Sequence, residues 1–308
     1  MWIGLVGSEM CIRDRSSANQ HPVNKRYPYY YFSHNYEMYR GRRLIERLES
    51  IDNVEINDIK KIQNDNFNYK AYEILPIILD ELDTSKLTYE QKIYFQNLKN
   101  WDYFAEVSNE NQVVFNEWWN NLYKNIWDEF DSLKYPYRKP NSFRTYKLIK
   151  EDKNSKFYDV ISTSKNESLN DLINKSFLEI TVKLDTFKKR NSLKKIKWGH
   201  YKNTTINHLL RIKSFSYDSV SIGGYRNILN AASERHGPSF RLIVKLKQNE
   251  KTKAWGVYPG GQSGNIGSQN YFGEVENWGK GVYNKLLFND NYMDNRNHII
   301  FEKKYNIK

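Results

Sequence analysis

Residues 236–246 read HGPSFRLIVKL and residues 254–265 read AWGVYPGGQSGN, and these two stretches decide the fold class. Residues 240–246 and 254–258 are rich in apolar, β-branched and aromatic side chains, as strands are. The polar residues 247–253 between them suit the loop of a hairpin. The glycines in residues 259–264 are too dense for a regular element to continue. The sequence therefore predicts an antiparallel hairpin that leads into a turn.

The chain before this hairpin has the pattern of helices. Apolar residues recur at helical spacing over residues 37–48 and, most clearly, over residues 113–130, as on the buried face of an amphipathic helix. Further helices are expected over residues 72–82 and 169–184. Residues 135–159 contain two prolines and are expected to run over the surface. Helices first and strands later, without strict alternation, indicate an α+β fold built in layers.

Two polar patterns predict where helices begin. Thr88 with Gln91 three residues later is typical of a capping box. Asn57 is the expected N-cap of a helix that carries Ile59 and Ile62.

Aromatic residues are abundant, and their role has two readings. Trp118 and Trp119 lie on the apolar face of the helix predicted over residues 113–130, and Trp127 follows near its end. They could form a ligand platform, but their helical spacing favours packing in a core.

The formal net charge of +12 invites a comparison with nucleic-acid-binding proteins. Lysine and arginine are scattered, with denser groups at residues 188–190 and 194–197. The sequence has no zinc-finger spacing, no aromatic RNA-binding motif and no basic helix leading into heptads. The charge therefore indicates a solvated surface. No apolar run approaches the roughly 18 residues of a membrane helix.

The first fifteen residues have a different origin from the rest in our interpretation. Residues 5–15 read LVGSEMCIRDR, and their back-translation resembles one frame of a transposase-type sequencing-library adapter. We therefore interpret residues 1–15 as an artefact and expect the native segment to span residues 16–308. Cys11, the only cysteine, lies in the excluded part, so neither disulfides nor thiolate metal sites are expected.

Four stretches, taken in order, resemble the penicillin acylase family, which includes cephalosporin and acylhomoserine-lactone acylases. The first two are residues 17–23 (SANQHPV), followed by Tyr27-Pro28 and residues 40–43 (RGRR), and residues 63–65 (QND). The third combines Trp198-Gly199 with residues 222–224, 230–232 and 236–241, and the fourth is residues 259–265 with Gly267-Ser268 and Tyr271.

This resemblance implies the C-terminal portion of the β chain of an N-terminal-nucleophile hydrolase. The fold would be part of an αββα layered sandwich with a helical insertion, helix-rich over residues 37–190 and β-rich over residues 198–303. Such enzymes cleave an N-acyl amide to a carboxylic acid and an amine through a serine ester. Their nucleophile is the first residue of the β chain and uses its own α-amino group as base. That serine is expected to be absent from this chain, which should be inactive alone.

The resemblance also assigns roles to residues of this chain. Asn19, three residues before Pro22, matches the asparagine whose side-chain amide stabilises the oxyanion; an ordinary turn residue is the alternative. Arg40 matches the arginine that orients this asparagine and the substrate, with Arg42 or Arg43 as alternatives. Gln262 and Ser263 could be presented into the site, although a purely structural turn is favoured.

Cofactors and partners follow from the same resemblance. The chemistry requires no cofactor, and the family's structural Ca²⁺ is doubtful because residues 29–32 (YYYF) replace the expected carboxylate. The partners implied are a small-molecule N-acyl amide and an upstream half that includes the α chain, with no nucleic acid and no membrane. A periplasmic location is expected by analogy. The alternative is a non-enzymatic, basic and aromatic-rich protein that binds nucleic acid or polysaccharide.

Overall fold

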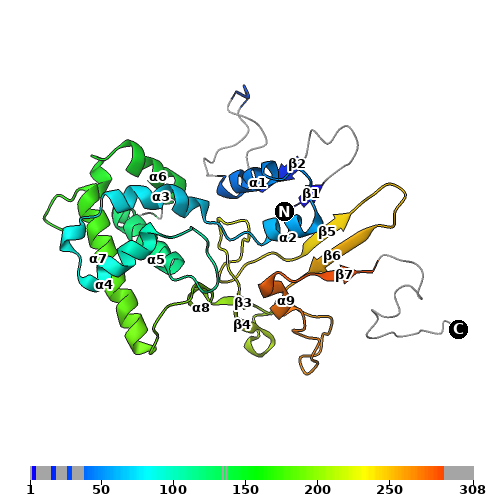
Figure 1. The fold of residues 1–308 in the computed structure, drawn as a ribbon. Helices are drawn as coiled ribbons and strands as arrows, with labels where there is room; N and C mark the ends of the chain where they lie inside the picture. Colours follow the sequence, from blue (N-terminus) through cyan, green and yellow to red (C-terminus); the bar gives the residue numbers. More distant parts are fainter. Residues whose placement is uncertain are drawn as a thin grey trace.

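The computed structural model describes residues 2–4, 15–18, 26–29, 38–133, 135 and 137–287. Figure 1 shows a group of longer helices on one side of the molecule and small sheets with shorter helices on the other. The helices are α1 Tyr39–Glu49, α2 Ile56–Gln63, α3 Tyr69–Asp80, α4 Tyr89–Lys99, α5 Asn111–Ile126, α6 Ser142–Glu151, α7 Leu169–Arg190, α8 Trp198–Lys202 and α9 Val275–Lys280. The strands are β1 Trp2–Gly4, β2 Arg15–Ser17, β3 Thr204–Ile206, β4 Tyr217–Val220, β5 Arg241–Lys245, β6 Lys253–Val257 and β7 Asn284–Leu286.

The helical region is built around α5 and α7, which lie side by side. Trp118 of α5 is fully buried, its ring centroid lies 4.7 Å from that of Phe177, and its indole N–H donates to the Ile173 carbonyl oxygen at 3.2 Å. Trp119 and Trp127 are also buried in this core. The core-packing interpretation of these three tryptophans is therefore confirmed, and they form no surface platform.

Two predicted helix starts have opposite outcomes. The capping box at α4 is confirmed, because Thr88 Oγ1 accepts from Gln91 N at 3.3 Å and Gln91 Oε1 accepts from Thr88 N at 2.9 Å. The prediction of Asn57 as an N-cap is wrong: α2 starts two residues earlier, and its capping box pairs Glu55 with Asp58. A carboxylate accepts the free N–H groups of a first turn as well as an amide does.

The prediction that residues 135–159 form a loose surface stretch is also wrong in part. Helix α6 lies within this stretch and begins at Asn141, whose side chain accepts from Arg144 N at 3.0 Å. Its Thr145 and Ile149 are buried, and Thr145 Oγ1 accepts the indole N–H of Trp127 at 2.9 Å. Pro140 precedes the helix and therefore does not interrupt it.

The described strands form three antiparallel sheets. The predicted hairpin is confirmed: β5 pairs with β6, with Ile243 opposite Trp255, and β7 joins the other edge of β6. Strands β3 and β4 form a second small sheet, and β1 pairs with β2.

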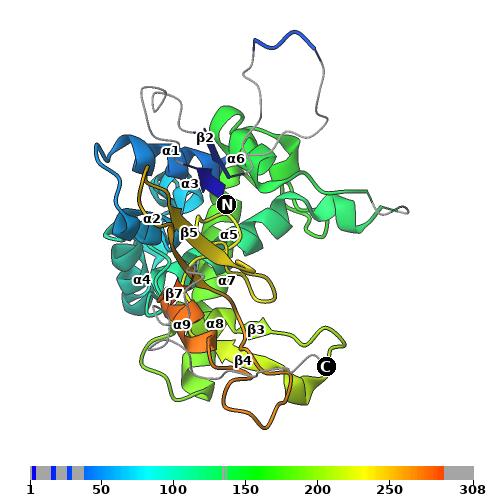
Figure 2. The same ribbon diagram turned by 90° about the vertical axis from the view of Figure 1, so that its right-hand side faces the viewer.

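One face of the β5–β6–β7 sheet packs on helices α2 and α9. Ile243 and Val257 are buried in a second apolar cluster, together with Ile59 and Ile62 of α2 and Trp278 of α9. Figure 2 shows the strands of this sheet from a second direction, with α9 below them.

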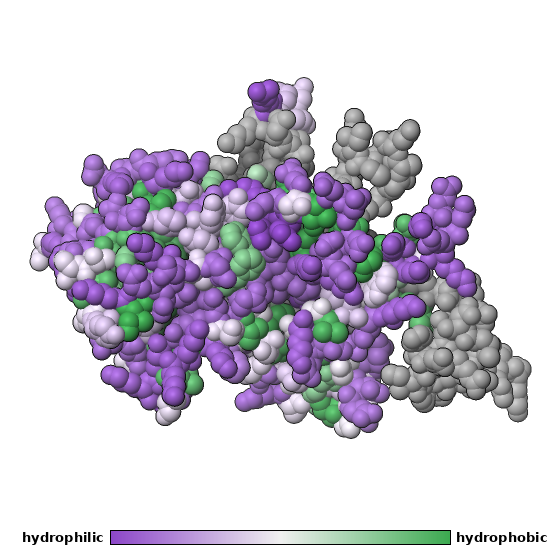
Figure 3. All heavy atoms as spheres, viewed as in Figure 1, coloured by the Kyte–Doolittle hydropathy of each residue, from purple (hydrophilic) through white to green (hydrophobic). Residues whose placement is uncertain are grey.

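The opposite face of this sheet is left open in the described residues. Side chains alternate across a strand, and Val244 and Leu246 are 42% and 71% exposed. Elsewhere the surface is as polar as the composition suggests, and the face drawn in Figure 3 is mainly hydrophilic with small separate apolar patches. No helix among the described residues has the length and apolar character needed to cross a membrane.

A short segment contributes to both apolar cores. Ile228 is buried in the helical core, and its neighbour Leu229 is buried in the second cluster. We call residues 223–233, which contain both, the seam loop. It ties the helical region to the sheet region within a few residues.

Candidate functional site

The arginines of α1 have different environments. Arg43 is buried and forms an ion pair with Asp65, with Nη2 2.9 Å and Nε 3.1 Å from Oδ2, while its guanidinium lies 4.2 Å from the Phe67 ring centroid. Arg42 donates to Glu73 at 2.7 Å and lies over the ring of Tyr69. Both therefore hold α1 against the segments that follow it.

Arg40 is the arginine of this series that lines a pocket. It makes no ion pair with any residue that the structure describes, and burial lowers the pKa of its guanidinium. The pocket, which we call the Arg40 pocket, has a volume of about 200 Å³. The described residues that line it are Arg40, Gln63, Leu229, Ala231, Gly237, Pro238, Phe240 and Arg241.

The wall of the Arg40 pocket is fixed by a chain of polar contacts around Asn230. The Asn230 amide Nδ2 donates to Asn66 Oδ1 at 2.9 Å, and its Oδ1 accepts from Arg241 Nη2 at 2.8 Å. The Asn230 backbone N–H donates to the Asp65 carbonyl oxygen at 3.0 Å. These groups are buried, so each bond satisfies a polar atom that water does not reach.

Glycine is required beside this asparagine. Gly224 has φ of +71°, and a Cβ there would overlap the Asn230 carbonyl oxygen. Only glycine adopts such a conformation readily and allows this close approach.

Lys202 of α8 holds both ends of the seam loop. Its Nζ donates to the carbonyl oxygens of Gly223, Gly224 and Ala232 at 2.8, 3.2 and 2.8 Å. The side chain is buried, and desolvation lowers its pKa to about 7. Lys202 thus positions the loop that lines the pocket.

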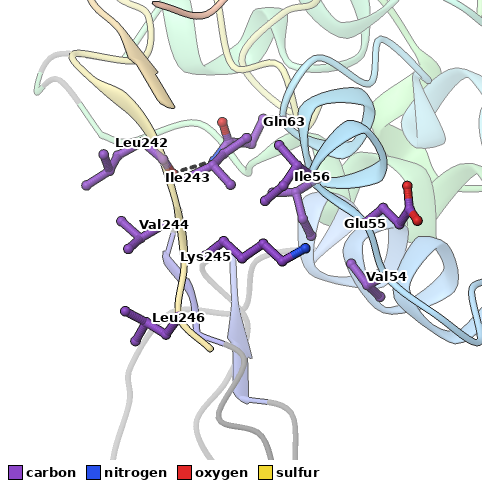
Figure 4. A pocket seen from close by; sticks show the side chains of 10 residues that line it. Val54, Glu55, Ile56, Gln63, Leu242, Ile243, Val244, Lys245 and Leu246 are labelled. Carbon is purple, nitrogen blue, oxygen red and sulfur yellow. Dashed lines mark hydrogen bonds between the residues drawn. The ribbon is translucent and has the colours of Figure 1, made fainter. Parts of the chain in front are cut away.

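Gln63 shows why residues 63–65 matter for this arrangement. Its Nε2 donates to the Leu242 carbonyl oxygen at 3.2 Å, and its Oε1 accepts from the Tyr283 hydroxyl at 2.6 Å. Figure 4 shows the first of these contacts at a second hollow of about 200 Å³ between α2 and β5. The polar residues that line this hollow are Glu55, Gln63 and Lys245, and the others that line it are apolar.

Asn19 lies outside the described residues. The residue before it, Ala18, is buried in the same cluster as Leu44 of α1. Strand β2, which ends at Ser17, therefore lies against the helix that carries Arg40.

Gln262 and Ser263 lie in a turn that does not contribute to the Arg40 pocket. Gln262 is exposed, and Ser263 N donates to the Asn270 carbonyl oxygen at 3.3 Å while Ser263 Oγ accepts from Asn265 N at 3.1 Å. These contacts stay within the turn.

The described residues do not offer a calcium site. No three His, Cys, Asp or Glu side chains gather among them closely enough to hold a metal ion, whereas Ca²⁺ takes about six to eight oxygen ligands. Of residues 29–32, only the exposed Tyr29 is described.

The contribution of Arg241 and Asn230 was missed by sequence reasoning. Arg241 also joins β5 to α9 by donating to the Trp278 carbonyl oxygen at 2.6 Å. A charged residue at an inward position of an otherwise apolar strand was the available signal, because such a residue is rarely buried without a partner.

The comparisons with known proteins agree with this architecture. The profile of the penicillin amidase family matches residues 15–295, whereas no curated protein matches the sequence. Among solved structures, the thermostable penicillin G acylase from Alcaligenes faecalis is similar, with a TM-score of 0.55 and 11% sequence identity. This match covers 95% of the chain and 56% of the acylase chain, so the chain spans little more than half of that relative. Because the family profile covers nearly the whole sequence, the chain belongs to the penicillin amidase family.

Proposed function

We propose that this chain is the C-terminal part of the β chain of an N-acyl amide hydrolase. One observation carries the proposal. Segments far apart in a sequence matched by the family profile converge on the Arg40 pocket: Arg40 from α1, Gln63 from α2, Ala231 from the seam loop and Arg241 from β5. Such convergence is what an active site built from several segments requires.

In this proposal the serine nucleophile lies upstream of the chain. A serine activated by its own α-amino group must be the first residue of a processed chain. Its attack on the amide carbonyl gives a serine ester and releases the amine, and water then releases the acid. The Asn19 amide donates to the oxyanion, and Arg40 orients Asn19 and the substrate.

The same proposal accounts for the open face of the sheet. In an αββα sandwich, each sheet is covered by helices on one face and by the other sheet on its second face. The β5–β6–β7 sheet has helices on one face, and Val244 and Leu246 are exposed on the other. We propose that a second sheet from the upstream half covers this face, in an enzyme located in the periplasm.

The polymer-binding alternative has less support. A ligand platform built on Trp118, Trp119 and Trp127 would need these residues at the surface, but they are at most 4% exposed. The basic residues at the end of α7 stabilise the helix C-terminus, and Lys188 is paired with Glu110 at 3.0 Å.

A reconstitution experiment tests the proposed function. The 308-residue chain alone should not hydrolyse a chromogenic N-acyl amide, whereas the complete processed enzyme should. In that enzyme, Asn19→Ala should lower kcat by roughly 10²–10³, and Asn97→Ala on the exposed side of α4 should not. Turnover by the 308-residue chain through one of its own serines would refute the mechanism.

A further inference from the structure

The connection between strands β3 and β4 exposes apolar side chains at its tip. Leu209 and Leu210 are 95% and 77% exposed, and Ile212 is 40% exposed. Single exposed apolar residues are common on protein surfaces, but a contiguous group of them marks a contact surface. We call residues 208–213 the leucine tip.

The shape of the leucine tip is fixed by hydrogen bonds within the connection. Ser216 Oγ accepts from His208 N and donates to the Ile212 carbonyl oxygen, both at 3.0 Å. Arg211 N donates to the His208 carbonyl oxygen at 2.8 Å, and Arg211 has φ of +58°. A non-glycine residue keeps this conformation only where its surroundings hold it there. The exposure of the two leucines is therefore built into the turn.

Three cations accompany the apolar side chains. Arg211 and Lys213 belong to the leucine tip, and Arg235 follows the seam loop. All three are exposed, and none of them forms an ion pair with a residue that the structure describes. They line one groove with a volume of about 730 Å³. The groove thus gathers positive charge from two separate segments beside the exposed leucines.

Two carboxylates also line this groove, and they do not cancel its charge. Glu234 accepts from the Tyr225 hydroxyl at 2.7 Å and from Arg226 Nη2 at 3.0 Å, so its charge is already compensated. Asp218 alone remains against the three cations. An excess of positive charge in a groove favours an anionic partner.

Apolar side chains next to uncompensated cations match the two layers of an anionic lipid surface. Apolar side chains enter the boundary between headgroups and acyl chains, while basic side chains are attracted to the phosphates of the headgroups. The groove is large enough to admit a headgroup. A narrow tip buries little area on a flat protein face, whereas lipids close around it.

We propose that the leucine tip inserts into the surface of an anionic lipid layer. Leu209 and Leu210 enter the boundary with the acyl chains, and Arg211, Lys213 and Arg235 contact lipid phosphates. The contact is peripheral, because only side chains of the tip enter the layer. It departs from the expectation, drawn from the family resemblance, that no membrane takes part.

Sedimentation of the 308-residue chain with lipid vesicles tests the proposal. The chain should bind phosphatidylglycerol vesicles roughly tenfold or more tightly than phosphatidylcholine vesicles, because the former carry a net negative charge. The double variant Leu209→Ser, Leu210→Ser should weaken binding to phosphatidylglycerol roughly tenfold or more. Leu246→Ser on the open face of the sheet is the control, matched by its 71% exposure, and should leave the binding unchanged.

The cations are tested by variants that remove one charge each. Arg211→Gln and Lys213→Gln should each weaken binding to phosphatidylglycerol roughly fivefold, and added salt should weaken the binding of the wild type. Arg144→Gln, at an exposed arginine on α6, is the control and should have no effect. Because all these side chains are exposed, each variant should keep the wild-type circular dichroism spectrum. If one of the two charge variants does not fold, the other decides.

Four outcomes would overturn the proposal. They are no binding to phosphatidylglycerol, equal binding to the two kinds of vesicle, unchanged binding in the double leucine variant, and an equal loss in Leu246→Ser. The complete processed enzyme must bind the same vesicles. If it does not, although the 308-residue chain does, the upstream half covers the leucine tip and the proposal fails. Vesicle binding involves no hydrolysis, so this failure and a failure of the proposed function are separate results.

Discussion

The helical region and the sheet region of this molecule are stabilised in different ways. In the helical region, α5 and α7 bury large apolar side chains such as Trp118 and Phe177 against each other. In the sheet region, the apolar cluster is smaller, one face of the sheet exposes Val244 and Leu246, and distant segments are joined by polar contacts such as Arg43–Asp65. From this comparison we infer that the burial of large apolar side chains contributes most to the stability of the helical region. In the sheet region, individual hydrogen bonds and ion pairs contribute more.

The largest effect is expected in the helical core. Trp118→Ala removes a fully buried indole and should lower the free energy of unfolding by about 3–5 kcal/mol. Urea unfolding followed by circular dichroism measures this change. Tyr89→Ala, at a side chain that is 76% exposed, is the control and should change it little. An equal loss in the two variants would mean that packing does not dominate this region.

The next largest effect is expected at the buried ion pair of the sheet region. Asp65→Asn leaves the Arg43 guanidinium buried without its counter-charge and should destabilise the protein by roughly 3 kcal/mol. Glu46→Gln alters a more exposed contact of the same arginine and should cost about 0.5 kcal/mol or less. Urea unfolding measures both free energies. An equally small loss in the two variants would contradict the inference that polar contacts stabilise the sheet region.

Two lysines, the buried Lys202 and the half-buried Lys70, predict how stability depends on pH. Burial lowers the pKa of Lys70, which lies over the Trp119 ring, and of Lys202 to about 7 in each case. An unfolded lysine has a pKa of about 10.4, so between these values the unfolded state binds more protons. Stability should therefore rise with pH from 7 to 9, by at most about 1.4 kcal/mol per pH unit for each lysine. Lys70→Met and Lys202→Met should each flatten this rise, and curves parallel to the wild type would contradict the assignment.

The smallest effect concerns a helix start in the helical region. Thr88→Ala removes the side-chain half of the α4 capping box and should cost about 1 kcal/mol. Thr88→Ser keeps the hydroxyl and should restore most of the loss in thermal unfolding. Equal losses in the two variants would show that the hydroxyl does not stabilise the helix.

The local features of this fold could be predicted from the sequence. The helices around α5 and α7, the β5–β6 hairpin and the Thr88 capping box depend on neighbouring residues and repeat at regular spacing. Helix α6 was missed because prolines before it obscured the pattern, although Asn141 marked its start. The cap of α2 was misplaced because Glu55 was not considered as a cap.

The candidate site was less predictable because its contacts join distant residues. The sequence placed Arg40 on a helix beside two alternatives, and only the structure shows that Arg42 and Arg43 have carboxylate partners. Asn230 bonds to Asn66 across 164 residues, and no local pattern announces such a pair. The position of Asn19 lies outside the described residues, so its role stays a prediction.

The seam loop couples structural changes in the helical region to structural changes in the sheet region. Ile228 and Leu229 are adjacent yet buried in different cores, so a shift of this backbone cannot relax one core without disturbing the other. A ligand that steadies the loop should consequently protect amides deep in α5 and α7 from hydrogen exchange, although it touches neither helix. Substitutions that harm the pocket need not lie anywhere near it.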